Sequence, residues 1–152
     1  MPRSLSVLIV EDDPCVLESL SSHLSALGHR VTPCRDAKEA LAALERETVQ
    51  LLITDAEMEG MNGLELIRQV RKTRPELGII MMTAYEGKYP MADALLAGAD
   101  GFLSKPFSLR SFSMIFERSY WEAISRPDWW DRNMAENGSA TAKKAATSAP
   151  AR

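Results

Sequence analysis

Acidic, hydroxyl and amine side chains stand at or just after four short apolar runs of the sequence. A carboxylate can attack phosphorus as a covalent nucleophile, and the transferred phosphoryl group then needs a cation, an ammonium and hydrogen-bond donors around its oxygens. The residues that could supply these parts are Glu11, Asp12, Asp13, Asp55, Thr83 and Lys105. If the fold brings them together, Asp55 is the candidate nucleophile, with Thr83 and Lys105 as candidate donors.

The elements that must position these residues follow from the alternation of apolar runs with amphipathic segments. Strands are expected over residues 5–10, 30–33, 51–54, 79–82 and 101–103, and helices over residues 14–27, 36–46, 63–74, 89–97 and from 108 onward. This pattern predicts a doubly wound α/β fold, in which helices cover both faces of a parallel sheet. Ligands of such sheets gather beyond the carboxyl ends of the strands, where these side chains would meet.

Local residue choices support these boundaries. Asp13 before Pro14 indicates a helix cap rather than a metal ligand, and Gly28 and Gly98 stand where helices should stop. Pro33 favours an edge position for the second strand. The last helix is expected to close the core with one stripe, formed by Leu109, Phe112, Ile115, Phe116, Ser119 and Ala123.

Carboxylates that meet in one crevice repel each other unless a divalent cation lies among them. Oxygen ligands favour Mg2+, which keeps several waters and takes one or two carboxylates together with phosphate oxygens. The acids after the first and third strands therefore predict a Mg2+ site that phosphate completes.

Four segments together resemble the receiver domains of two-component response regulators (CheY-like). They are LIVEDD at residues 8–13, ITDAEM at 53–58, MTA at 82–84 and SKPF at 104–107, and the resemblance spans about residues 5–124. The family implies a flavodoxin-like five-stranded sheet in the order 2-1-3-4-5. It also implies a phosphoryl donor that is a histidine kinase, a histidine phosphotransfer protein or a small acyl phosphate.

The resemblance assigns a role to each matching residue. Asp55 would be the phosphoacceptor, Thr83 and Lys105 would bind the phosphate, and Thr83 with Phe102 would form the switch. Phe102 stands where the family more often has tyrosine, and the loop MEGMNG at residues 58–63 departs from the usual proline and aspartate. The expected Mg2+ ligands are Glu11, Asp12, Asp55 and the backbone carbonyl of Glu57.

Composition sets broad limits on the class of protein. The 152 residues are 45% hydrophobic and 26% charged, with a net charge of -3, which is typical of a globular domain and offers no broad basic field for nucleic acid. Cys15 and Cys34 are expected to be free buried thiols. Because no apolar run near the start is long enough for a signal sequence or a membrane span, we expect a cytoplasmic protein without a membrane partner.

Residues 1–126 are expected to form the receiver domain, and residues 127–152 a C-terminal extension that contains tryptophan and is then disordered. No stretch after the last helix is long enough for an output domain, so we expect a stand-alone receiver. For Trp121, Trp129 and Trp130, packing on the domain and binding a partner both remain open.

The leading hypothesis is a phosphorylation-dependent regulator, not an enzyme, that signals to an unidentified protein target by contact; a homodimer is compatible with the sequence. A phosphorelay shuttle or phosphate sink is the alternative. An aspartate-nucleophile phosphatase of the haloacid dehalogenase type is disfavoured, because its nucleophile follows the first strand whereas Asp55 follows the third. A pseudo-receiver scaffold is disfavoured because the phosphorylation residues are present.

Overall fold

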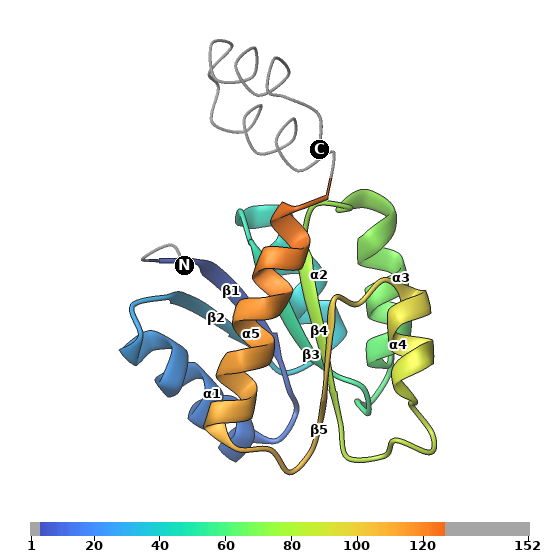
Figure 1. The fold of residues 1–152 in the computed structure, drawn as a ribbon. Coiled ribbons are helices and arrows are strands. Elements are labelled where there is room, and N and C mark those ends of the chain that lie inside the picture. The colour runs from blue at the N-terminus through green and yellow to red at the C-terminus, as the bar shows by residue number, and fades with distance from the viewer. Residues whose placement is uncertain (1–3, 127–152) are drawn as a thin grey trace.

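A computed structural model describes residues 4–126 of the chain, and the expected C-terminal extension with Trp129 and Trp130 lies outside the described residues. Strands and helices alternate along this part (Figure 1). The strands are β1 (Ser6–Val10), β2 (Arg30–Cys34), β3 (Leu51–Asp55), β4 (Gly78–Thr83) and β5 (Gly101–Ser104). The helices are α1 (Pro14–Ala26), α2 (Ala37–Arg46), α3 (Gly63–Thr73), α4 (Met91–Ala97) and α5 (Leu109–Ile124).

All pairings in the sheet are parallel, and the strand order is β2-β1-β3-β4-β5. The predicted fold class and strand order are therefore confirmed, as is the edge position of the strand that carries Pro33. Strands β3 and β4 are buried throughout, because helices cover both faces of the sheet. No helix within residues 4–126 combines the length and apolar character needed to cross a bilayer.

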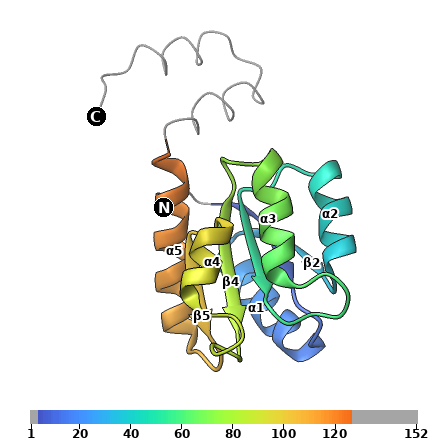
Figure 2. The same ribbon diagram turned by 90° about the vertical axis from the view of Figure 1, so that its right-hand side faces the viewer.

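Alternate strand residues supply two apolar cores, one on each face of the sheet. Val7 and Ile9 of β1 pack in a cluster with side chains of α1 and α5, whereas Leu8 and Val10 pack in a cluster with α2, α3 and α4. Figure 2 shows the same division, with α5 and α2 at opposite sides of the view. Because the apolar clusters lie on the two faces of the sheet, the ends of the strands can carry polar side chains.

The capping residues support the predicted start of α1 and the predicted ends of α1 and α4. Asp13 accepts a hydrogen bond from the backbone N–H of Cys15, as expected for a cap, and Gly28 and Gly98 adopt positive φ angles of 95° and 119° after their helices. Helix α4 begins at Met91 rather than at Tyr89, because Pro90 occupies the N-cap and Tyr89 belongs to the preceding turn.

Two expectations about burial were wrong. Leu109 is 46% exposed, because it is the first residue of α5 and lies at the end of the stripe, whereas Phe112 and Phe116 are buried as expected. Cys15 is exposed in the first turn of α1, and only Cys34 is a buried free thiol.

A cluster of charged side chains at the amino end of the sheet was not predicted. Asp100, whose side chain is 8% exposed, forms ion pairs with Arg71 and Arg126. Both arginines also donate to backbone carbonyls, among them that of Leu77. Because Arg126 follows α5, these contacts fix the end of the last helix to the start of β4.

Replacing Asp100 with alanine should leave both arginines without their buried counter-charge. We expect the free energy of unfolding to fall by about 3 kcal/mol, since removal of one partner of a buried ion pair leaves an uncompensated charge. Urea denaturation measures this loss. The exposed Asp93 of α4 is the matched control, and Asp93→Ala should cost less than about 1 kcal/mol. Equal losses of unfolding free energy in Asp100→Ala and Asp93→Ala would show that the ion pairs of Asp100 do not stabilise the fold.

Candidate functional site

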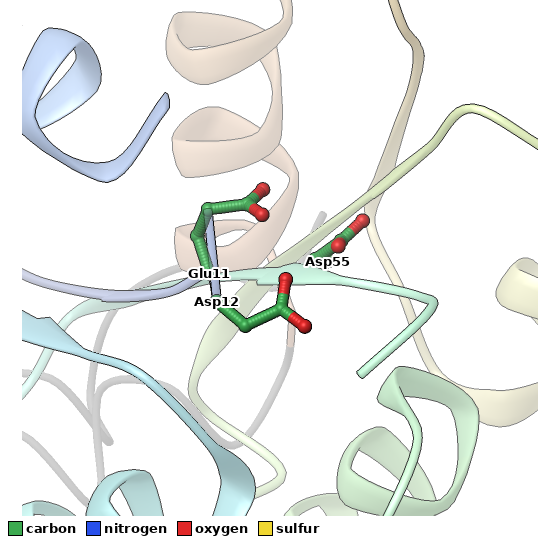
Figure 3. Close-up of side chains that lie close together, drawn as sticks. All are labelled: Glu11, Asp12 and Asp55. Carbon is green, nitrogen blue, oxygen red and sulfur yellow. The ribbon is translucent and has the colours of Figure 1, made fainter. Parts of the chain in front are cut away.

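Neighbouring strands bring the predicted acidic residues together. Glu11 and Asp12 follow the last residue of β1, and Asp55 is the last residue of β3, which pairs directly with β1. One carboxylate oxygen from each of the three residues lies within 4.8 Å of the others. Figure 3 shows the three side chains gathered at the ends of their strands. The carboxyl edge of the sheet therefore carries a compact acidic cluster, as the sequence predicted.

Burial makes this cluster electrostatically unfavourable. Glu11 is 1% exposed and Asp55 is 5% exposed, whereas Asp12 is exposed to solvent. Burial raises the pKa of Asp55 above its ordinary value, and the nearby charge of Asp12 raises it further. Burial also raises the pKa of Glu11, to which the charge of Asp55 adds. The cluster thus requires positive charge.

Lys105 supplies positive charge at the same edge of the sheet. It follows β5, and its Nζ lies 2.6 Å from Glu11 Oε2 and 3.3 Å from Asp55 Oδ1. Burial alone would lower the pKa of Lys105, but the hydrogen bond to Glu11 and the charges of Asp55 and Glu11 outweigh it and raise the pKa. Lys105 is therefore held as a cation that bridges two of the acids.

Asp55 and Glu11 are both held in fixed orientations. Asp55 Oδ1 also accepts a hydrogen bond of 3.0 Å from the backbone N–H of Ala56. Glu11 Oε1 accepts one of 3.1 Å from the backbone N–H of Asp13, so both Glu11 oxygens are engaged. Asp12, by contrast, is exposed to solvent, so an added ion can reach its carboxylate.

Thr83 is fully buried at the end of β4, the neighbour of β3. Its Oγ1 accepts a hydrogen bond of 2.9 Å from the backbone N–H of Tyr85, and its carbonyl accepts one of 2.7 Å from the N–H of Lys105. A hydroxyl that accepts one hydrogen bond can still donate another. The structure thus places Thr83 and Lys105 on adjacent strand ends beside Asp55.

The two remaining predicted residues lie at the margin of the acidic cluster. The Glu57 side chain points to Lys88, at 3.1 Å, so its carboxylate is not a member of the cluster, and the role of its backbone carbonyl stays a prediction. Phe102 of β5 is half-buried against the core cluster of α2, α3 and α4, and its role as a switch also stays a prediction.

Some features beside the site were missed by the sequence analysis. Lys88 was not singled out, although opposite charges on the loops after β3 and β4 could have indicated a contact.

A pocket of about 500 Å³ beside the site was also missed. The residues that line it include Cys15, Val16, Leu20, Lys105, Pro106, Phe107 and Leu109. The periodicity of apolar residues did not predict this pocket, because the pocket forms between α1 and the loop before α5.

Comparison with known proteins relates the whole arrangement to one family. The family model described as "Response regulator receiver domain" matches residues 7–116. The chain is 39% identical over 105 residues to the response regulator protein FleR of Pseudomonas aeruginosa, covering 69% of this chain and 22% of that protein. It is also 39% identical over 106 residues to the response regulator MprA of Mycobacterium ulcerans, covering 70% of this chain and 46% of that protein.

A solved structure shows the same fold. The response regulator protein TrrA from Thermotoga maritima, in complex with Mg2+ and BeF, matches with a TM-score of 0.69 and 29% identity, covering 76% of this chain and 98% of that one. The chain spans less than half the length of FleR and MprA, so their activities as whole proteins are not transferred to it. The family match over most of its length nevertheless shows that this chain belongs to the response-regulator receiver-domain family.

Proposed function

We propose that this chain accepts a phosphoryl group on Asp55 and signals, in the phosphorylated state, through contact with a protein target. The observation that carries the proposal is the position of Lys105, whose ammonium bridges Glu11 and Asp55 at 2.6 and 3.3 Å. A nucleophilic carboxylate, acidic metal ligands and a fixed cation are the parts that phosphoryl transfer needs. The proposed donor is a histidine kinase, a histidine phosphotransfer protein or a small acyl phosphate.

In the proposed transfer, a carboxylate oxygen of Asp55 forms a bond to phosphorus. The bond from phosphorus to the donor breaks at the same time, and the donor leaves with the electron pair as a carboxylate or, after taking up a proton, as a neutral imidazole. Ala56 and Lys105 hold the attacking carboxylate in place through Oδ1. Lys105 and the hydroxyl of Thr83 then meet the charge on the phosphoryl oxygens.

The donor set fits Mg2+, because hard carboxylate oxygens from Glu11, Asp12 and Asp55 converge within 4.8 Å. Since both oxygens of Glu11 already accept hydrogen bonds, we assign Asp12 and Asp55 as the direct carboxylate ligands. Glu11 contributes charge beside them, and the Glu57 carbonyl completes the protein's ligand set. When bound, the ion would neutralise charge on the phosphoryl oxygens.

Thr83 and Phe102 are proposed to transmit the phosphorylated state. Register places them on adjacent strands, since Met81 of β4 lies opposite Phe102 and Thr83 lies opposite Ser104. Attraction of the Thr83 hydroxyl to the phosphate would shift the β4 end, and the half-buried Phe102 ring can then move inward. The face formed by α4 and β5 changes as a two-state population shift. A phosphatase role is not proposed, because Asp55 ends β3 while the acidic pair follows β1.

Incubation with acetyl phosphate and Mg2+ should add the mass of one phosphoryl group to the chain, as measured by intact-protein mass spectrometry. Asp55→Asn should abolish the gain because its side chain cannot form an acyl phosphate, and chelation of the metal should prevent it. Asp93→Asn, which removes an exposed acid on α4, is the control and should behave as the unaltered chain. An undiminished gain in Asp55→Asn would place the modification elsewhere and contradict the proposal.

Without Mg2+, Asp55→Asn should stabilise the protein. Because burial raises the folded-state pKa of Asp55 above its unfolded-state value, ionisation of Asp55 reduces stability as the pH rises from the unfolded-state pKa through the folded-state pKa. Asparagine avoids it, so we expect the free energy of unfolding to rise by about 1 kcal/mol. Added Mg2+ should stabilise the unaltered chain more than the variant.

Thermal denaturation with and without Mg2+ measures both effects. Asp93→Asn again serves as the control, because it removes a carboxylate that lies outside the cluster. A lower melting temperature for Asp55→Asn in the absence of metal, together with an equal response to Mg2+, would show that the buried charge of Asp55 does not act as described.

A further inference from the structure

An ion pair joins the loop that follows β3 to the loop that follows β4. Residues 56–62 follow β3 and residues 84–90 follow β4, its neighbour in the sheet. Lys88 Nζ in the second loop lies 3.1 Å from Glu57 Oε1 in the first, although the residues are 31 positions apart in the chain. Glu57 is two residues beyond the proposed phosphoacceptor, so the pair stands at the rim of the site.

The loop after β4 is held by a series of hydrogen bonds that begins at Thr83. The backbone N–H of Tyr85 donates to Thr83 Oγ1 at 2.9 Å, and the N–H groups of Lys88 and Tyr89 donate to the carbonyl of Tyr85 at 3.0 and 2.8 Å. Tyr89 is buried and anchors the turn in the core. A continuous series of contacts therefore runs from the Thr83 hydroxyl through this turn to Lys88 and across to Glu57.

The loop after β3 is fixed at its ends. Ala56 donates to the carbonyl of Met82 at 2.8 Å, and Gly63 donates to the carbonyl of Ala56 at 2.9 Å. Between these ends Met58 is buried, and the carboxylate of Glu57 forms the ion pair with Lys88 of the other loop.

The ion pair is too exposed to support the fold as a whole. The Lys88 and Glu57 side chains are 62% and 42% exposed, and surface ion pairs of this kind contribute little to global stability. Its effect should be local, since it restrains two loops whose inner ends are already held by hydrogen bonds next to Asp55 and Thr83.

We propose that Lys88 is a positioning residue, which acts through Glu57 to hold the two loops together beside Asp55 and so slows hydrolysis of the phosphoryl group. The inference rests on the proposed function, because it requires a phosphoryl group on Asp55. In hydrolysis a water oxygen bonds to phosphorus and the bond from phosphorus to the Asp55 oxygen breaks. Asp55 leaves as the carboxylate with the electron pair, and both protons of the water stay on the released inorganic phosphate. Joined loops limit the approach of that water.

The test measures how fast the phosphoryl group is lost. The full chain is loaded with acetyl phosphate and Mg2+, separated from the donor, and followed by intact mass over time. Lys88→Met and Glu57→Gln should each lose the group about two- to fivefold faster, with unchanged melting temperature. Lys88→Arg, which keeps the positive charge, should keep nearly the original rate. Lys72→Met, which removes an exposed lysine near the far end of α3, is the matched control and should have no effect.

Amide hydrogen exchange gives a readout that does not need the phosphoryl group. Residues 57–61 and 84–88 should exchange faster in Lys88→Met than in Lys72→Met. Equal exchange in these loops, together with equal rates of loss, would overturn the inference. It would also be overturned if Lys88→Met accelerated loss and Glu57→Gln slowed it, because Glu57 would then assist the water. If the unaltered chain never takes up a phosphoryl group, the proposed function itself fails, and the inference fails with it.

Discussion

Repulsion among carboxylates at the ends of β1 and β3 is the constraint on which the other features of the site depend. Glu11 and Asp55 are almost completely buried, and with Asp12 they bring their oxygens within 4.8 Å of one another. Such a cluster reduces stability unless cations compensate for it. Lys105 offsets part of this negative charge, and a divalent cation among the carboxylates would offset the rest.

The parallel sheet makes this arrangement possible at little structural cost. Because β1, β3, β4 and β5 all run in one direction, their carboxyl ends present side chains from distant parts of the chain at one edge. The hydrophobic clusters on the two faces fix the strands, so the edge need not contribute to the core. The loops after β3 and β4 can then carry charged side chains, such as Glu57 and Lys88, without altering the positions of the strand-end residues.

Features that follow from the pattern of apolar runs were predictable, whereas individual side-chain contacts that this pattern does not align were not. The strand order followed from the family resemblance, whereas the meeting of Asp12 and Asp55 followed from their positions after apolar runs. Exposure of Leu109 was missed because the period of a helix does not show that its first residue lies at the exposed end of the apolar stripe. The ion pairs of Asp100 were missed because no pattern near Asp100 identifies its partners, which lie on α3 and after α5. The chemical roles assigned to the site residues stay predictions.

A crystal structure of the chain with Mg2+ and beryllofluoride would test the central claim most directly. We expect the beryllofluoride group on Asp55, contacted by Lys105 and by Thr83. We also expect the ion between the carboxylates of Asp12 and Asp55, with the Glu57 carbonyl among its ligands. An ion bound away from these carboxylates, or beryllofluoride attached elsewhere under saturating conditions, would contradict it.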